Sequence, residues 1–442
     1  MNTLAIMNEI EDACKREFAP FVERLRDRGT SGLSRLEPEL LEQVLHFGAT
    51  IMSKALQAMT EIEAESTTCP HCGARALSQG HRDREAKTLL GPIHFERRVF
   101  QCRPCHVLFA PMDRSLGIES GCDFTGHSKS EMALLAAHMD FDAASGILGR
   151  LTGLDASDGG IRIVAEQIGS RVADERETLP PAQSAASRLV DRSAPAGRTL
   201  VLQADGVMGR FTDDWHEAMV GVVAEIIGHK KDGRPILRVL EVVTIPRDRT
   251  TFWQVFNAAA KRQGLETAKH VLFVGDAGGG NFDLASELDA TMEQVLDFYH
   301  ASQHLYAALE AGYADCGKAE IDKRHETLKE RLKQKGGADA VIRRLAKLAT
   351  RSVLSAAAQD TLRREIEYFR KNCHRMHYFS LRERGFPVAS GLIEGLCRSV
   401  FQERFKESGM IWSTPGMRAI AALRDAALSK RWQQAVAPRL AA

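Results

Sequence analysis

Two Cys-x-x-Cys pairs constrain the fold of this chain more than any other feature of its sequence. The pairs are formed by four residues, Cys69 with Cys72 and Cys102 with Cys105. A turn of this kind points two thiolates at one ion, and two such turns supply the tetrahedral site that Zn²⁺ accepts. We therefore predict a structural zinc site in a ribbon over residues 67–118, with a β-hairpin between the turns. Four unpaired, buried cysteines are the alternative, and His71 and His106 are substitute ligands that the site does not need.

Composition places the chain in a broad class. It has nine cysteines and no signal-peptide pattern at its N-terminus, which favours a reduced compartment over a disulfide framework. Its 442 residues, 44% hydrophobic and 26% charged, suit several globular domains. Because no apolar run reaches the ~18 residues that span a membrane, we expect a cytoplasmic protein without a membrane partner.

The net charge of +1 conceals an uneven distribution along the chain. Residues 1–66 carry 7 Lys and Arg against 12 Asp and Glu, whereas residues 318–384 carry 18 against 9. Residues 398–431 are also basic, with 7 against 3. A basic C-terminal half offers a surface for a polyphosphate such as DNA. A solvated helix face that happens to be rich in Lys and Arg is the alternative.

The first 66 residues are expected to form an N-terminal helical region. Apolar side chains recur there at spacings of three and four, as Leu41, Val44 and Leu45 illustrate. No internal repeat accompanies this pattern.

Residues 123–178 are also expected to be helical, with a break at Gly153 and Leu154. Either Asp155 or Ser157 could cap the helix that follows. A helix, a short turn and a second helix form the layout of helix-turn-helix modules that read DNA. Arg162 and Arg171 could face a groove and are candidate DNA ligands. Plain helical packing is the alternative.

A stretch rich in Pro, Ala and Ser, residues 179–198, predicts a linker and a domain boundary. Beyond it the pattern indicates the order β-β-β-α-β-α-β. The expected strands are 199–210, 216–228, 236–245, 270–280 and 292–300, and the expected helices are 250–264 and 281–290. An Asp-Gly pair at residues 232–233 favours a hairpin between the second and third strands. Three antiparallel strands followed by right-handed crossovers make a mixed sheet with helices on both faces.

Three acids along this second half suggest a cation site. We place Asp205 at the end of the first strand and Asp276 at the end of the fourth, and these two strands are neighbours in the expected sheet. Held together, the carboxylates favour a divalent cation, and oxygen ligands favour Mg²⁺ or Mn²⁺. Glu394, at the start of a C-terminal helix, is the best third acid. Taken singly, each aspartate also suits a turn and Glu394 a helix cap.

These acids stand in motifs that resemble a known family. The segments are QADG at Asp205, VGDAGGG at Asp276, DFYH at 297–300, GFPVASGLIEG at 385–395 and ERFKESGMIWS at 403–413. They are similar to bacterial insertion-sequence transposases with an Asp-Asp-Glu triad, closest to the ISKra4 family and more widely to the ISL3 and Mutator-like groups. The chain departs from the pattern at Gly395, where the family more often has Ser, and at Glu407, where many relatives have Gly.

The resemblance implies a multidomain α+β protein with an RNase H-like α/β catalytic core. The core would occupy residues 199–300 and 386–442, with an all-helical insertion over 301–385. Asp205, Asp276 and Glu394 match the triad that holds two Mg²⁺ or Mn²⁺ ions.

The resemblance also assigns auxiliary residues. Asp297 and His300 match a pair that lies near the scissile DNA in related enzymes. Alternatively, His300 is structural, or pairs with His304 as a helical metal site. Trp412 matches a position that could stack on an extruded base, or it is a core residue. Arg404 and Lys406 are candidate phosphate ligands.

The function expected from these features is DNA transposition in the bacterial nucleoid. The N-terminal parts would recognise double-stranded DNA at terminal inverted repeats, and the core would cleave the strand and join it to target DNA as a dimer or higher oligomer. The rivals are a catalytically inactive, transposase-derived DNA-binding regulator, a structure-selective RNase H-like nuclease, and a zinc-stabilised scaffold with no role on DNA.

Overall fold

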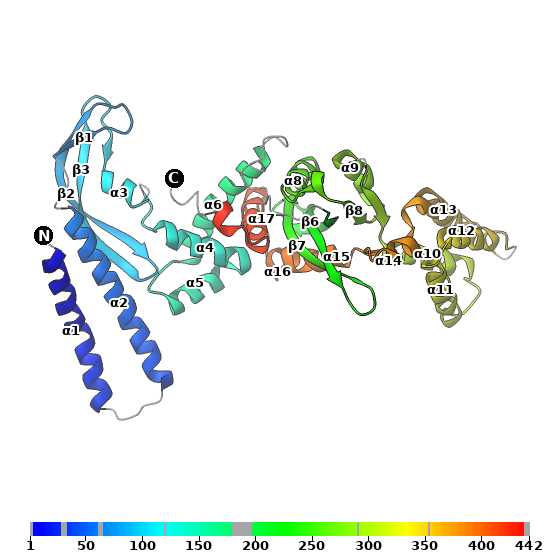
Figure 1. The fold of residues 1–442 in the computed structure, drawn as a ribbon, viewed down its shortest axis with the longest axis horizontal. Coiled ribbons are helices and arrows are strands. Elements are labelled where there is room, and N and C mark those ends of the chain that lie inside the picture. Colours follow the sequence, from blue (N-terminus) through cyan, green and yellow to red (C-terminus); the bar gives the residue numbers. More distant parts are fainter. Residues whose placement is uncertain are drawn as a thin grey trace. The chain divides into compact units, whose positions relative to one another are not determined.

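The computed structural model describes residues 3–27, 33–60, 65–118, 121–178, 197–289, 291–351 and 354–436. Residues 179–196 of the predicted linker lie outside these ranges. The chain divides into two compact units, each described here by itself. Unit 1 comprises Met1–Val172 with Arg431–Ala442, and unit 2 comprises Ala173–Lys430. Both units contain helices and a sheet, so the predicted α+β class is confirmed at that level (Figure 1).

Unit 1 begins with two long helices, α1 (Thr3–Asp27) and α2 (Leu33–Thr60), which lie side by side (Figure 1). The rings of Phe18 and Phe47 meet edge to face at 5.3 Å. Near the other end of the pair, Lys54 donates to Glu9 at 3.1 Å. Contacts that run in opposite directions along the two helices show that the pair is antiparallel, and the predicted helices over residues 1–66 are confirmed where the structure describes them.

A four-stranded antiparallel sheet follows in unit 1. Its strands, in spatial order, are β1 (Ser66–Thr68), β2 (Arg75–Thr88), β3 (Gly91–Cys102) and β4 (Leu108–Phe109). The hairpin of β2 and β3 lies between the two Cys-x-x-Cys turns, as predicted. Strand β4 pairs with the end of β3. Farther along the same strand, the Ser53 and Gln57 side chains of helix α2 accept the backbone N–H groups of His94 and Glu96. Such cover satisfies an edge that would otherwise be open to other strands.

Helical structure then returns, as predicted for residues 123–178. Its elements are α3 (Pro111–Ser115), α4 (Gly126–His138), α5 (Phe141–Leu151) and α6 (Asp158–Thr178). The break at Gly153 is a close approach, because a Cβ there would lie 2.5 Å from the carbonyl oxygen of Leu90. Ser157 caps α6, since its hydroxyl accepts the Gly160 N–H at 3.1 Å. The predicted pair of helices with a short turn is therefore present.

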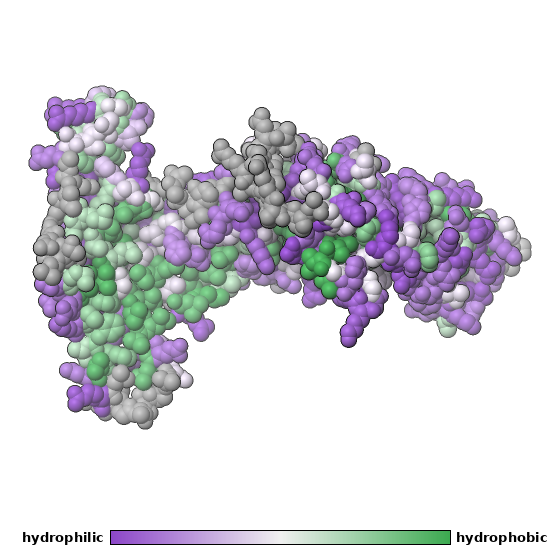
Figure 2. All heavy atoms as spheres, viewed as in Figure 1, coloured by the Kyte–Doolittle hydropathy of each residue, from purple (hydrophilic) through white to green (hydrophobic). Residues whose placement is uncertain are grey.

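The surface of unit 1 over α2 and α5 carries an apolar area (Figure 2). Leu41, Val44 and Met52 on α2 and Leu151 on α5 are exposed.

In the described part of the chain, no helix combines the length and the apolar composition needed to cross a bilayer.

Unit 2 is built on a five-stranded sheet. Its strands are β5 (Thr199–Arg210), β6 (Trp215–His229), β7 (Pro235–Pro246), β8 (His270–Gly275) and β9 (Glu293–Leu296). The spatial order is β7-β6-β5-β8-β9. The three N-terminal strands pair antiparallel, and β8 and β9 are added in parallel. The predicted mixed sheet and the neighbouring of its first and fourth strands are thus confirmed.

Two crossover helices complete this sheet, α8 (Arg249–Arg262) and α9 (Asn281–Leu288). Helix α8 buries Phe252, Trp253 and Phe256 against the sheet, and a Cβ on Gly221 would lie 2.8 Å from the Phe252 ring. A glycine is therefore needed where α8 crosses β6. The Asp-Gly hairpin is present, with Gly233 at φ 80° in the left-handed region that glycine tolerates.

The fifth strand is shorter than predicted. It ends at Leu296, and Asp297 begins a helix, whereas the sequence pattern extended the strand to residue 300. The carboxylate of Asp297 accepts the N–H of His300 at 2.6 Å, which is the bond of a helix N-cap. An apolar-polar run of nine residues cannot by itself distinguish a strand from a strand followed by a capped helix.

A helical region follows β9 in unit 2. Its helices are α10 (Phe298–Gly312), α11 (Lys318–Leu332), α12 (Gly337–Leu348), α13 (Ala356–Asn372) and α14 (Tyr378–Glu383). Their apolar faces share one continuous core with the sheet, which includes Leu305, Leu345 and Phe369. The predicted all-helical segment is present, and it begins three residues earlier than expected.

The last elements of unit 2 return to the sheet. One continuous helical stretch contains α15 (Gly391–Leu396), a π-helical turn over Cys397–Gln402 and α16 (Glu403–Phe405), and α17 (Thr414–Leu428) follows. Lys430, shortly after α17, takes a positive φ of 56° and separates it from the last helix. The short α18 (Trp432–Ala435) belongs to unit 1, where Trp432 Nε1 donates to Ser130 at 3.0 Å.

Candidate acidic site and metal centre

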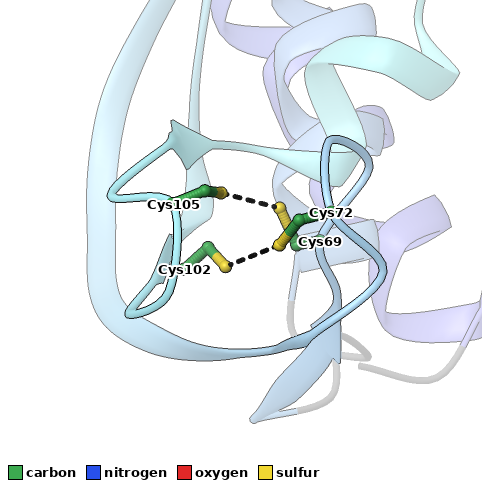
Figure 3. A group of neighbouring side chains, drawn as sticks. All are labelled: Cys69, Cys72, Cys102 and Cys105. Carbon is green, nitrogen blue, oxygen red and sulfur yellow. Dashed lines mark hydrogen bonds between the residues drawn. The ribbon is translucent and has the colours of Figure 1, made fainter.

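The four paired cysteines converge in unit 1 (Figure 3). The Sγ atoms of Cys69 and Cys105 lie 3.6 Å apart, and those of Cys72 and Cys102 lie 3.4 Å apart. Within the described residues, these cysteines form the one group of possible metal ligands whose ligand atoms all lie within 4.8 Å of one another. The cluster could hold a structural zinc ion, with all four tetrahedral positions filled by sulfur.

Backbone N–H groups favour the thiolate form of one of these cysteines. Burial opposes ionisation of Cys69, but N–H groups of Cys72 and His71 point at its sulfur, and its pKa falls to about 6. Gly73, at φ 74°, and His106, at φ 58°, occupy the left-handed region that closes each turn. The two histidines are not members of the cluster, so the prediction that they are not needed agrees with the geometry.

The first two acids of the second site are set by strand register. The parallel pairing of β5 with β8 matches Leu202 with Phe273. Continued by three residues, this register places Asp205 level with Asp276, which directly follows β8. The prediction that Asp205 ends its strand is wrong, because β5 continues to Arg210 along β6. Asp205 instead lies in mid-strand, three residues past the last one that pairs with β8.

The third acid, Glu394, is positioned over the same sheet by hydrogen bonds of Gln203. Gln203 is fully buried two residues before Asp205, so the two side chains share a face of β5. Its Oε1 accepts the Ile393 N–H at 2.9 Å, and its Nε2 donates to the Ala389 carbonyl at 3.3 Å. These bonds fix the start of α15 over the sheet, and Glu394 is the next residue along.

Electrostatics show that the acids are near one another. Burial raises the pKa of Asp205, the Gly206 N–H that donates to it at 2.8 Å acts in the opposite direction, and the charges of Asp276, Glu394 and Glu217 raise it further. The three predicted acids do not reach the 4.8 Å spacing seen among the cysteines. Like charges repel across such a site, and a divalent cation would reverse that effect. The oxygen-only donor set fits Mg²⁺ or Mn²⁺.

Sequence reasoning missed three polar neighbours of these acids. Glu217, on β6, lies against Gly206, where a Cβ would meet its carboxylate at 2.1 Å. Asn281, at the start of α9, donates to Asp276 Oδ1 at 3.1 Å. Arg249, at the start of α8, bonds Asn281 and lies 3.6 Å from Glu217. Only the strand register that sets β6 beside β5 would have revealed Glu217.

Asp297 has a different position from the one the motif suggested. It is 2% exposed, and besides capping α10 it accepts both the N–H and the hydroxyl of Ser390, at 2.5 and 2.9 Å. Its own N–H donates to the Gly275 carbonyl at 2.8 Å. Asp297 therefore ties the end of β8 to the loop before Glu394, and it is too buried to contact DNA directly. Its bonds give Asp297 a positioning role, and the predicted role near scissile DNA stays a prediction.

His300 lies in the first turn of α10, not at a strand end. Its ring is half-buried and lies 5.0 Å from that of His304. His304 Nδ1 is bonded to Glu365 at 2.7 Å. Among the described residues these histidines belong to no metal-ligand cluster.

Two of the predicted DNA ligands lie in the core. Arg404 is fully buried and Trp412 is 7% exposed, and the guanidinium lies 5.0 Å from the indole ring. Trp412 also packs edge to face on Phe405. For Trp412 this burial agrees with the alternative of a core residue. For Arg404 it argues against the predicted contact with a phosphate.

The remaining predicted ligands are exposed. Lys406 lies 5.8 Å from the Trp215 ring. Burial and the charges of Asp205 and Glu394 raise the pKa of Cys397 to about 12, and the charge of Lys406 acts against them. Arg162 and Arg171 lie on α6 with exposed side chains.

Comparison of the sequence with known protein families and with characterised proteins finds no match.

Proposed function

We propose that this chain is a DNA transposase that cleaves and joins phosphodiester bonds at the acidic site of unit 2. One observation carries the proposal. Asp205, Asp276 and Glu394 come from β5, the end of β8 and α15, far apart in sequence, yet the charges of the latter two raise the pKa of Asp205. Three carboxylates that meet without a cation repel one another and oppose folding. Their convergence is therefore better explained by a function than by a need of the fold.

The surrounding architecture supports the proposal. The sheet order β7-β6-β5-β8-β9, with three antiparallel strands and two parallel additions, is the order expected of an RNase H-like core. The helices α10–α14 stand between Asp276 and Glu394, where the resemblance places a helical insertion.

Chemistry at this site would depend on divalent ions held by the three acids. Bound there, two Mg²⁺ or Mn²⁺ ions would supply an activated oxygen nucleophile and stabilise the leaving oxygen. The protein's own part is geometric. Gln203 and Asp297 fix the loop that carries Glu394, while Asn281 orients Asp276.

In this proposal the other parts deliver DNA. Helix α6, which follows α5 after a short turn, exposes Arg162 and Arg171, which would contact the terminal inverted repeats. The zinc cluster would stabilise the sheet beside them.

The test is cleavage of labelled duplex DNA that carries the ends of the element, in Mg²⁺ or Mn²⁺. We expect metal-dependent nicking at the end, and its loss in Asp276→Asn. The matched control is Asp232→Asn, an exposed aspartate in the β6–β7 loop of the same unit, which should cut normally. Tight binding to the ends with no cleavage by the unmodified protein would favour the DNA-binding regulator instead.

A further inference from the structure

A cleft opens in unit 2 directly beyond the acidic site. It has a volume of about 820 Å³ and lies between the glycine-rich loop after Asp276 and the helices α10 and α13. Gly278 and Gly280 form its wall on the loop side. A Cβ on Gly278 would lie 2.8 Å from the Asp276 carboxylate, so the loop passes close to the acid. The cleft and the acidic site therefore share the Asp276 loop.

One side of the cleft is a column of aromatic rings. The rings of His304 and Tyr368 are parallel, 3.7 Å apart and 17° from coplanar. His300 adds an edge-to-face contact at 5.0 Å. The bond from His304 to Glu365 fixes its ring. Burial, followed by the charge of Asp276, raises the pKa of Tyr368, so this column lies within the electrostatic reach of the acid.

The rim of the cleft is positively charged. Helix α13 contributes Arg363, Arg364 and Lys371, all exposed, against Glu367. Deeper in, Arg375 is held rigidly. Its guanidinium lies 4.2 Å from the ring of Phe282, and it donates to Gln294 and Asn372. The surface over these helices is predominantly hydrophilic in Figure 2.

A column of stacked aromatic rings, beside one fixed guanidinium and several exposed cations, is the kind of surface that binds unpaired nucleotides. Bases of a strand stack on the rings, and its phosphates pair with the guanidinium and ammonium groups. A duplex hides its base faces within the stack, so the rings would be useless for it. The sequence motifs did not single out α13, apart from its excess of basic residues.

We propose that this cleft binds the single-stranded DNA that leaves the acidic site, holding the unpaired nucleotides next to the cleavage point. This inference rests on the proposed function, because it assigns the cleft to the same DNA. It goes further by naming α13 and the His304–Tyr368 column as the elements that bind the unpaired nucleotides.

Binding can be tested without cleavage. Fluorescence anisotropy would measure the affinity of the full chain for a short labelled oligo-dT in EDTA. Arg364→Glu combined with Lys371→Glu should weaken binding roughly tenfold or more, because two phosphate contacts become repulsions. The matched control is Arg343→Glu with Arg344→Glu, two exposed arginines on α12 outside the cleft. It should bind nearly as the unmodified chain does.

A second measurement tests the aromatic column. An abasic strand keeps the phosphates and lacks the bases, so the unmodified chain should bind it roughly five- to one-hundredfold more weakly. Equal affinity for the two strands would show that phosphates alone are held and would overturn the stacking assignment. Equal weakening by the α12 and α13 variants would overturn the cleft itself, since charge anywhere on the helices would then suffice. Melting curves of the variants confirm folding.

The outcome is separable from that of the proposed function. Asp276→Asn should retain oligo-dT binding, because the anion-binding groups lie on α13. Binding in the cleft by a chain that never nicks DNA would support this inference and contradict the transposase. Nicking at element ends that is indifferent to the α13 variant would do the reverse.

Discussion

The carboxylate of Asp205 lies in surroundings that oppose its ionisation. Burial is the first cause and three neighbouring acids add to it, against a single hydrogen bond from Gly206. A carboxyl whose pKa is higher in the folded than in the unfolded chain binds its proton more tightly when folded. Its contribution to stability is then present at low pH and lost as the pH rises through the folded pKa.

Replacing Asp205 by Asn should therefore stabilise the metal-free protein at neutral pH. We expect the melting temperature at pH 7 to rise by up to about 2 °C, and the gain to disappear at a pH near the pKa of an ordinary carboxyl. The measurement is a series of thermal melts in EDTA from acid to neutral pH. Asp232→Asn is the control, because Arg234 lowers the pKa of Asp232 and its removal should not stabilise the chain. A gain that is the same at every pH would contradict the electrostatic explanation.

Gly278 is a second residue whose chemistry is set by the site. A Cβ there would lie 2.8 Å from Asp276 Oδ2, a distance that real side chains do not tolerate. Gly278→Ala should displace the carboxylate and weaken Mn²⁺ binding, measured by calorimetry, roughly tenfold or more, as supporting-residue changes at metal sites do. Gly395→Ala, beside Glu394, meets nothing within 4 Å and should bind Mn²⁺ normally. Equal effects from both glycines would show that the loop does not limit the site.

At the scale of elements, the strands were predictable because their apolar runs are long. The order β-β-β-α-β-α-β followed from those runs and the turn residues, and it placed the strands of Asp205 and Asp276 together. The surroundings of three side chains depend on contacts that a one-dimensional pattern does not contain. Asp297 bonds a distant loop at Ser390, and Arg404 and Trp412 are buried in the core.

Glu217 was missed for a related reason. It lies against Gly206, next to Asp205, because the antiparallel register of β6 with β5 pairs it with Met208, on the same face as Gly206. In an alternating strand pattern, a glutamate is normally assigned to the solvent-exposed face. Cross-strand neighbours depend on register, and register depends on turn length, which the sequence determines only loosely.

The ribbon in unit 1 depends on its cysteines more than on its small core. Beside the cluster the core consists of Ala76, Phe100 and a few half-buried side chains. We expect one zinc ion per chain by elemental analysis, lost in Cys69→Ser and in Cys102→Ser, with lower melting temperature in both, because metal binding supplies folding free energy. Cys316→Ser changes a cysteine outside the cluster, whose thiol donates to the neighbouring Asp315 at 3.8 Å, and should keep the metal. Full zinc occupancy in Cys102→Ser would contradict the four-sulfur site.

At the scale of the whole molecule, charge and chemistry are segregated. The first 66 residues are acidic, whereas residues 318–384 carry twice as many basic as acidic side chains. The basic segment covers α11–α14, and it reaches the cleft beside Asp276 through α13. DNA bound to unit 2 would be attracted by this basic segment and would need no attraction to the acidic first two helices. Two ends of an element would have to be held at once, which is the reason to expect at least a dimer.

Strand joining tests this account most directly, because a nuclease or a regulator would not perform it. A pre-cut element end with a free 3′-hydroxyl is mixed with a target plasmid and Mn²⁺, and joined products are counted by sequencing. The account predicts covalent joining by the unmodified chain, none by Asp276→Asn, and normal joining by Asp232→Asn. Equal joining by the Asp276→Asn variant, or cutting of the target without joining by the unmodified chain, would contradict it.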